Sequence, residues 1–134
     1  MEIRNAASAP MGHGETVLIV EDNNEIRALA AHQLRRFGYA VIEAIDPGDA
    51  LAILRSSQHI DLLFTDVVMP GGLSGPDLAE QAKALRPGLK ILFTSGFPDI
   101  RSGGCPQAGM LLSKPYRSQE LARKLHEALQ RIEP

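Results

Sequence analysis

Short apolar runs alternate with longer amphipathic segments along the chain from residue 16 onward. The first, third and fourth runs are apolar almost throughout, which is typical of parallel strands that are covered on both faces. The third run, within "DLLFTDVVMP", ends on an acid, Asp66. The five runs predict β-strands at Thr16–Glu21, Tyr39–Ala44, Ile60–Asp66, Leu89–Ser95 and Gly109–Ser113.

The segments between the runs carry apolar residues at helical spacing. In the first helix, the residues expected to face inward are Ile26, Leu29, Ala30, Leu34 and Phe37. In the next two helices they are Ala50, Leu51 and Leu54, followed by Leu78, Ala82 and Leu85. A last helix begins near Ser118, and its apolar stripe consists of Leu121, Leu125, Ala128, Leu129 and Ile132.

Turn residues mark the ends of these helices. Gly38 is expected to end the first helix, and Asp46 is expected to cap the second, with Pro47 in its first turn. Gly75 and the proline after it begin the third helix. The segment Gly96–Ala108 holds two prolines and three glycines, so we expect at most one or two helical turns there. The alternation of strands and helices predicts an α/β domain with a parallel sheet and right-handed crossovers.

Composition narrows the class of protein. Residues 1–14 are rich in Ala, Ser, Pro and Gly and predict a flexible tail or linker, while residues 15–134 predict a single domain. The net charge of −2 gives no electrostatic reason to expect binding to nucleic acid or to an anionic membrane. The longest aliphatic run, Val17–Val20, is too short to span a bilayer. Cys105 is the only cysteine, which excludes an internal disulfide and favours a reducing cytoplasm.

Chemically active side chains stand at the predicted carboxyl ends of the strands. Glu21 and Asp22 follow the first strand, and Asp66 ends the third. Thr94 lies at the end of the fourth strand, and Lys114 follows the fifth. Ligands of open α/β sheets bind outside the carboxyl ends of the strands, so we expect these five side chains to converge on one functional site.

The charges of this cluster predict a divalent cation. Carboxylates about 5 Å apart repel by roughly 3 kcal/mol per pair at an effective dielectric constant of about 20. The acids Glu21, Asp22 and Asp66 carry three negative charges, and Lys114 restores only one positive charge. A doubly charged ion would make the cluster neutral. Oxygen ligands without His or Cys favour Mg²⁺ over zinc or copper.

Four motifs give the chain a family resemblance. "VLIVEDN", "LLFTDVVMP", "ILFTSG" and "LLSKPY" occur in this order and spacing. Together they resemble the receiver domain of two-component response regulators over residues 16–132. The stretch "APMGHGETVLIVEDN" is similar to the linker that precedes receivers at the end of hybrid histidine kinases. The resemblance implies a doubly wound, five-stranded parallel sheet with strand order 2-1-3-4-5. The irregular segment before the last strand predicts a short or irregular fourth helix.

The resemblance also implies phosphoryl chemistry in a phosphorelay. A sensor histidine kinase or a His-containing phosphotransfer protein would donate a phosphoryl group to Asp66, forming an aspartyl phosphate. Thr94 and Lys114 would contact the phosphoryl oxygens, and the peptide bond after Lys114 resembles the cis bond of the family. The domain would assist its own phosphorylation and dephosphorylation, so we expect a signalling domain rather than an enzyme.

The metal ligands implied by the resemblance are all oxygens. Asp22 and Asp66 would bind Mg²⁺ directly, and Glu21 would bind it through water. The main-chain carbonyl of Val68, two residues beyond the phosphoacceptor, would complete the protein ligands.

One departure from the family pattern leaves alternatives open. Receivers usually carry an aromatic residue three positions before the lysine, where this chain has Leu111, while Tyr116 stands on the other side of the lysine. Leu111 favours an altered output surface, a phosphate relay, or a receiver-like scaffold that works without phosphorylation; the intact acids and lysine favour phosphorylation. A phosphatase with an Asp nucleophile would need a second acid at the position of Val68, which disfavours that class.

The partners expected are proteins. Only 20 residues follow Lys114, enough for one helix and no DNA-binding unit, so we expect no direct contact with nucleic acid. We expect a cytoplasmic monomer or weak homodimer. A free-standing receiver and a receiver module of a hybrid kinase both remain open.

Overall fold

The computed structural model describes residues 10–69, 73–95 and 110–130. Its strands are β2 (Thr16–Val20), β3 (Ala40–Ala44), β4 (Leu62–Asp66), β5 (Lys90–Ser95) and β6 (Met110–Ser113). Its helices are α1 (Asn24–Arg36), α2 (Pro47–Arg55), α3 (Gly75–Leu85) and α5 (Ser118–Gln130). All five predicted strands are present, with ends that differ from the predicted bounds by one or two residues.

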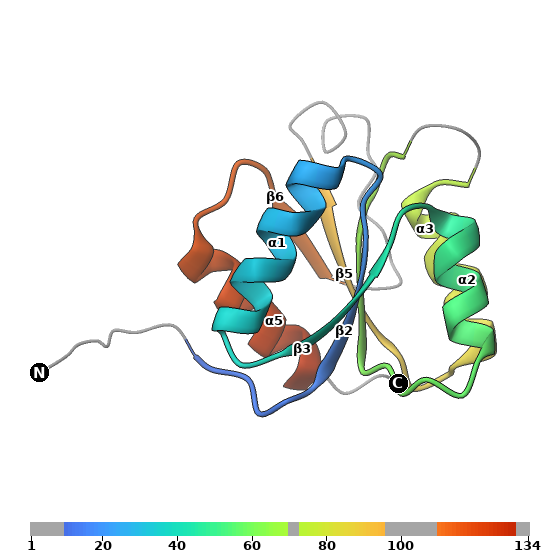
Figure 1. Cartoon of the computed structure of the whole chain (residues 1–134), viewed down its shortest axis with the longest axis horizontal. Helices are drawn as coiled ribbons and strands as arrows, with labels where there is room; N and C mark the ends of the chain where they lie inside the picture. Colours follow the sequence, from blue (N-terminus) through green and yellow to red (C-terminus); the bar gives the residue numbers. More distant parts are fainter. Residues whose placement is uncertain (1–9, 70–72, 96–109, 131–134) are drawn as a thin grey trace, which may run out of the picture.

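The strands form one parallel sheet between two layers of helices. The order across the sheet is β3-β2-β4-β5-β6. Because β2 is the first strand along the chain, this arrangement is the expected order 2-1-3-4-5. Figure 1 shows α1 and α5 on one face of the sheet and α2 and α3 on the other. The central strands β2, β4 and β5 are therefore covered on both faces, which explains their continuous apolar sequences.

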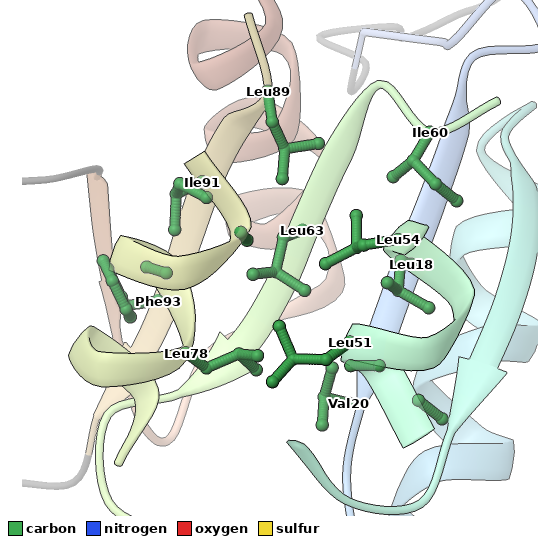
Figure 2. Packing of buried hydrophobic residues seen from close by; sticks show 14 of the residues in the cluster. Leu18, Val20, Leu51, Leu54, Ile60, Leu63, Leu78, Leu89, Ile91 and Phe93 are labelled. Atoms are coloured by element: carbon green, nitrogen blue, oxygen red, sulfur yellow. The ribbon is translucent and has the colours of Figure 1, made fainter. Parts of the chain in front are cut away.

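Each face of the sheet has its own hydrophobic core. Because successive side chains of a strand point to opposite faces, Leu63 contributes to the core under α2 and α3, and Phe64 contributes to the core under α1 and α5. Figure 2 shows the first of these cores, with Leu51, Leu78 and Phe93 among its labelled side chains. Full burial of one such side chain stabilises the fold by about 1.5–3 kcal/mol.

Local hydrogen bonds fix where the helices begin. The side chain of Asp46 accepts a hydrogen bond of 2.7 Å from the main-chain N–H of Asp49, which confirms the predicted cap of α2. Asn23 caps α1 and Ser74 caps α3 in the same way. Gly38 follows the end of α1 with a φ of +92°, a conformation that favours glycine, so the predicted end of this helix is confirmed.

Three residues predicted to face inward are exposed instead. Ile26 is 50% exposed and Leu29 is 60% exposed, because the buried side of α1 is centred on Ala30 and Leu34. Successive residues of a helix are rotated by about 100°, so Leu29 points well away from Ala30. Leu85, the last residue of α3, is 41% exposed. The predicted inward-facing sides of α1 and α3 therefore included residues that the fold leaves exposed.

Several predictions fall outside the described residues. They concern the tail over residues 1–9, the irregular segment 96–108 with its expected short helix, the lone Cys105, and Ile132. The remainder of the predicted tail, residues 10–14, lies against the end of α1: the N–H of Gly12 donates to the carbonyl of Phe37, and the N–H of Gly14 donates to Gly38.

Candidate functional site

The carboxyl ends of four strands bring four of the five predicted side chains to one place. Glu21, Asp66, Thr94 and Lys114 line the same pocket, whose empty volume is about 280 Å³ including its open mouth. The strand register explains this placement, because Asp66 on β4 lies directly beside Thr94 on β5. The N–H of Lys114 donates to the carbonyl of Ser95 at 2.8 Å and holds the end of β6 at the same level.

Asp66 has one carboxylate oxygen that accepts from two partners. The ammonium of Lys114 lies 2.8 Å from Oδ1 of Asp66, and the hydroxyl of Thr94 donates to the same oxygen. The Asp66 side chain is 19% exposed and therefore remains reachable from solvent. Neither contact uses Oδ2, so they orient the carboxylate while leaving its second oxygen for other chemistry.

Glu21 is the most perturbed acid of the site. Its side chain is buried, and burial raises its pKa to about 7. A hydrogen bond from the N–H of Asn23 opposes this rise, while the charge of Asp66 and hydrogen bonding with Asp22 and Asp66 add to it. Glu21 is thus close enough to interact with both of the other predicted acids. The charged form of Glu21 is therefore disfavoured, and a divalent cation bound nearby would favour it.

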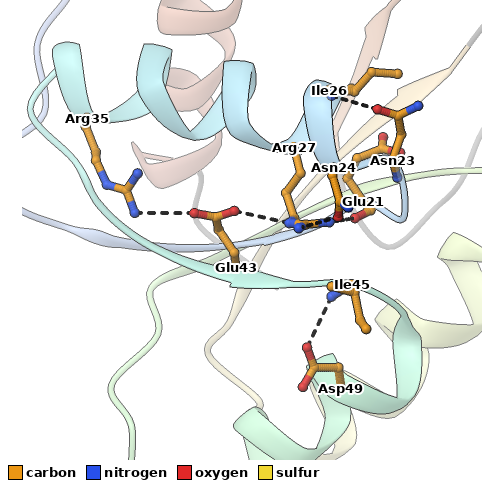
Figure 3. A network of polar contacts seen from close by, with 9 residues as sticks. All are labelled: Glu21, Asn23, Asn24, Ile26, Arg27, Arg35, Glu43, Ile45 and Asp49. Atoms are coloured by element: carbon orange, nitrogen blue, oxygen red, sulfur yellow. Dashed lines mark hydrogen bonds and ion pairs between the residues drawn. The ribbon is translucent and has the colours of Figure 1, made fainter.

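Hydrogen bonds shape the turn that carries two of these acids. The N–H of Asn23 donates to Oε2 of Glu21 at 3.0 Å, and the Asn23 side chain accepts from the N–H of Ile26 at 2.9 Å. The guanidinium of Arg27 reaches back to the main-chain carbonyl of Glu21 at 2.8 Å. Figure 3 shows these contacts at the start of α1. Asp22, between two anchored residues, is exposed and is not among the residues that line the pocket.

A close backbone contact fixes the end of β4. The N–H of Val67 donates to the carbonyl of Thr94, and the N–H of Gly75 donates to the carbonyl of Val67. A Cβ on Gly75 would overlap the main-chain oxygen of Asp66, so α3 can begin here only with glycine. The sequence suggested Gly75 as a helix start but gave no sign of this contact with Asp66.

An apolar wall completes the pocket. Ile26 and Ala30 of α1, Phe64 of β4 and Tyr116 after β6 line it together with the charged groups. Burial, followed by the charges of Asp66 and Glu21, raises the pKa of Tyr116. The Lys114–Pro115 bond is cis, as the family resemblance implies.

Leu111 and Tyr116 lie on opposite faces of the sheet. Leu111 packs against the core under α2 and α3, whereas Tyr116 packs against the core under α1 and α5. The aromatic ring next to the site is therefore on the α1 side. Leu111, an apolar side chain, occupies the family's usual aromatic position on the α2 and α3 side of the sheet.

The site offers oxygen ligands rather than a closed metal cage. Within residues 10–69, 73–95 and 110–130, no three His, Cys, Asp or Glu side chains are arranged to hold a metal by themselves. Mg²⁺ does not need such a cage, because it keeps several waters and binds through one or two carboxylates. Asp22 and Asp66 supply carboxylates of this kind. Val68 stands two residues after β4 with its side chain 59% exposed, and the role of its carbonyl stays a prediction.

Comparison with known proteins decides the family. The model of the response regulator receiver domain matches residues 17–126. The chain belongs to this family. The receiver domain is 31% identical over 116 residues to the response regulator receiver protein CpdR of Brucella abortus, and the match covers 84% of this chain and 95% of CpdR.

The receiver domain is also similar to part of a kinase. It is 32% identical over 120 residues to the sensor kinase CckA of Brucella abortus, which covers 87% of this chain and 13% of the kinase. A solved receiver domain from the hybrid histidine kinase CckA superposes with a TM-score of 0.71 and 34% identity, covering 86% of this chain and 99% of that one. These matches confirm the predicted likeness to receivers of hybrid kinases.

Family membership establishes the general function. Receiver domains of two-component systems accept phosphoryl groups and interact with histidine kinases or phosphotransfer proteins. None of the helices in the described ranges combines the length and the apolar character that a bilayer crossing requires.

Sequence reasoning missed one polar residue of the site. Arg27 contacts the acidic turn from the second turn of α1, and no motif marks it in a single sequence. The signal in the sequence was the position of Arg27, a basic residue that follows the adjacent acids Glu21 and Asp22 on the next helix.

Proposed function

We propose that this receiver domain takes a phosphoryl group onto Asp66 from a histidine kinase or a His-containing phosphotransfer protein. The observation that supports this most directly is the arrangement around Oδ1 of Asp66, where the Lys114 ammonium and the Thr94 hydroxyl meet. A partly exposed carboxylate with a cation and a hydroxyl donor beside it is a competent phosphoryl acceptor.

The transfer is a displacement at phosphorus. A carboxylate oxygen of Asp66 attacks, and an O–P bond forms as the P–N bond of the donor histidine breaks. The electron pair of that bond stays on the imidazole nitrogen. Lys114 pairs with Asp66 before transfer and is placed to pair with a phosphoryl oxygen afterwards. The hydroxyl of Thr94 is placed to donate to another phosphoryl oxygen.

We propose Mg²⁺ as the cofactor of this transfer. Asp22 and Asp66 would hold the ion, with Glu21 acting through water and the carbonyl of Val68 as a further ligand. Bound Mg²⁺ supplies charge neutralisation for the phosphoryl oxygens. The donor set of this chain suits the ion, because the side chains in question offer only oxygen atoms and carry a net excess of negative charge.

The donor protein needs a surface beside the pocket. Ile26 lines the pocket and is half exposed, and Leu29 extends the same apolar strip along α1. This strip is continuous with the site, so a donor resting on it would have its histidine near Asp66. We therefore propose the strip of Ile26 and Leu29 as part of the donor contact.

The test is phosphoryl uptake from a small labelled donor, such as acetyl phosphate, with and without Mg²⁺. We expect the wild-type chain to incorporate label only with Mg²⁺ and the Asp66→Asn variant to incorporate none. Asp61→Asn is the matched control, because Asp61 is at the other end of the same strand, and it should label like wild type. Equal labelling of Asp66→Asn and wild type would disprove the proposal.

A scaffold that works without phosphorylation remains the second candidate. Leu111 favours it, because a leucine packed into the core under α2 and α3 offers no hydroxyl that could follow the state of Asp66. The same assay separates the two functions, since a scaffold needs no label on Asp66. We propose a signalling role rather than an enzymatic one in both cases.

A further inference from the structure

Arg27 connects the acidic turn to two other elements. Its Nη1 donates to the main-chain carbonyl of Glu21 at 2.8 Å, and its Nη2 donates to the side chain of Asn24 at 2.8 Å. Its Nε lies 3.1 Å from the carboxylate of Glu43 on β3. The Arg27 side chain is only 13% exposed, and its contact with the Glu21 carbonyl is partly buried. Figure 3 shows the guanidinium between α1 and β3.

The contact with Glu21 satisfies a group that the sheet leaves open. The N–H of Glu21 still bonds to the carbonyl of Ala44 at 3.1 Å, as the last hydrogen bond between β2 and β3. The carbonyl of Glu21 lies beyond the strand, and Arg27 is its donor. Because the main chain of Glu21 is held from both sides, the direction in which the chain continues into Asp22 is fixed.

Glu43 holds the guanidinium in place. It accepts from Arg27, and its other oxygen lies 3.6 Å from Arg35, about two turns further along α1. The charge of Arg27 is thus balanced by an acid outside the site. The planar guanidinium can therefore bond Glu43 and the Glu21 carbonyl at the same time through different nitrogens. The single ammonium of a lysine cannot reproduce this geometry.

We propose that Arg27 is a positioning residue that sets the metal-binding turn, so that Asp22 and Glu21 face Asp66 before Mg²⁺ arrives. The inference rests on the proposed function, because it assigns Arg27 to the binding of the ion needed for phosphoryl transfer. Arg27 touches neither the ion nor the phosphoryl group; it acts through the main chain of Glu21. Groups that orient metal ligands in this way commonly change metal affinity by about 10-fold or more when removed.

The test is Mg²⁺ titration of the unphosphorylated chain by calorimetry, followed by phosphoryl uptake at graded Mg²⁺. In Arg27→Ala we expect the Kd for Mg²⁺ to rise about 10-fold. The maximal labelling rate at saturating Mg²⁺ should stay near wild type, because the ligands themselves are intact. A merely structural role would lower stability without moving the Mg²⁺ concentration for half-maximal rate.

Arg35→Ala is the matched control, because it removes an arginine that contacts Glu43 but does not reach Glu21. Arg35 is 53% exposed, and its loss should leave the Kd within about 2-fold of wild type, as for other exposed ion pairs. Arg27→Lys keeps the positive charge but loses the planar guanidinium. Glu43→Ala removes the carboxylate that holds the guanidinium in place. Both should raise the Kd by less than Arg27→Ala does, and they carry the test if Arg27→Ala does not fold.

The outcomes separate the inference from the function. If wild type binds Mg²⁺ and labels, but the folded Arg27 and Glu43 variants bind Mg²⁺ as wild type does, the positioning role is wrong and the proposed function stands. If wild type neither binds Mg²⁺ nor labels, the proposed function fails and the inference fails with it.

Discussion

Two aspartates stand at opposite ends of strand β4 and differ in their surroundings. Asp61 precedes the strand, and its carboxylate accepts from the N–H of Thr16 at 2.8 Å and contacts His59 at 2.9 Å. Asp66 ends the strand, and it faces Lys114 together with other carboxyl groups. The chain provides hydrogen-bond partners for both oxygens of Asp61. The acids at the other end of the strand carry more negative charge than Lys114 balances.

The difference shows which end of the sheet is built for a ligand. At the amino end of β4, a main-chain N–H and the ring of His59 contact both oxygens of Asp61, so its role is structural. At the carboxyl ends, the charge of Asp66 disfavours the charged form of Glu21, and the proposed Mg²⁺ would relieve this repulsion. Substitutions at the two ends should therefore differ in their effects on phosphoryl uptake and on stability.

Removal of Lys114 should have the largest effect on chemistry. In Lys114→Ala, we expect the rate of phosphoryl uptake to fall about 100-fold, because one preorganised charge at the transferring group is lost. Lys90→Ala removes a lysine at the opposite end of the sheet and should leave the rate unchanged. Rates of label incorporation from a small donor at saturating Mg²⁺ provide the measurement; equal rates in both variants would contradict the assignment.

The two aspartates should differ in their contributions to stability. Asp61→Asn weakens the contacts with Thr16 and His59, so we expect the free energy of unfolding to fall by about 1–3 kcal/mol. Asp66→Asn relieves repulsion at the site, so the free energy of unfolding should stay the same or rise. Urea unfolding without divalent ions measures both. A larger loss in Asp66→Asn would mean that the site is held together by this carboxylate.

The apolar strip on α1 should matter for a protein donor alone. In Leu29→Asp, we expect transfer from a cognate kinase or phosphotransfer protein to slow about 10-fold, which corresponds to about 1.4 kcal/mol. Uptake from the small donor should not change. Leu85→Asp places the same charge on an exposed leucine at the far end of α3 and serves as the control. Equal slowing in the two variants would exclude Leu29 from the donor contact.

The buried acid Glu21 should make the stability of the fold depend on pH. The pKa of Glu21 is about 7 in the folded chain, above its ordinary value, so the folded state binds the proton more tightly than the unfolded state. The stability contributed by this proton is complete below the ordinary pKa of a glutamate, and it is lost as the pH rises through about 7. Glu21→Gln should therefore show a flatter fall in the free energy of unfolding between mildly acidic and mildly basic pH.

Urea titrations of wild type and Glu21→Gln across this range, without divalent ions, isolate the contribution of Glu21. Identical pH profiles would mean that Glu21 titrates normally. Added Mg²⁺ should oppose the loss at high pH in wild type, because it binds the charged form of the acid cluster.

Much of the fold and the main site residues could be predicted from the sequence. Parallel strands place their carboxyl ends at one edge, so Glu21, Asp66 and Lys114 were expected together as soon as the strands were recognised. The strand order came from the family resemblance rather than from the apolar pattern. Hydropathy alone does not say which strand neighbours which.

Other features depend on packing that the sequence pattern does not encode. Leu29 and Leu85 have helical spacing from buried residues, yet they are exposed because a helix buries only the side that meets the sheet. The overlap that forbids a side chain at Gly75, and the reach of Arg27 to Glu21, depend on how helices pack against strand ends. Contacts between elements distant in the sequence require coordinates.

The most direct test of the account locates the phosphoryl group itself. The chain is phosphorylated with a small donor and Mg²⁺ and then treated with sodium borohydride, which reduces an aspartyl phosphate to homoserine. Peptide mass spectrometry then reads the position. We predict homoserine at position 66 and unchanged aspartate at positions 22 and 61. Homoserine at either of those positions, or at none, would contradict the claim that Asp66 is the phosphoryl acceptor.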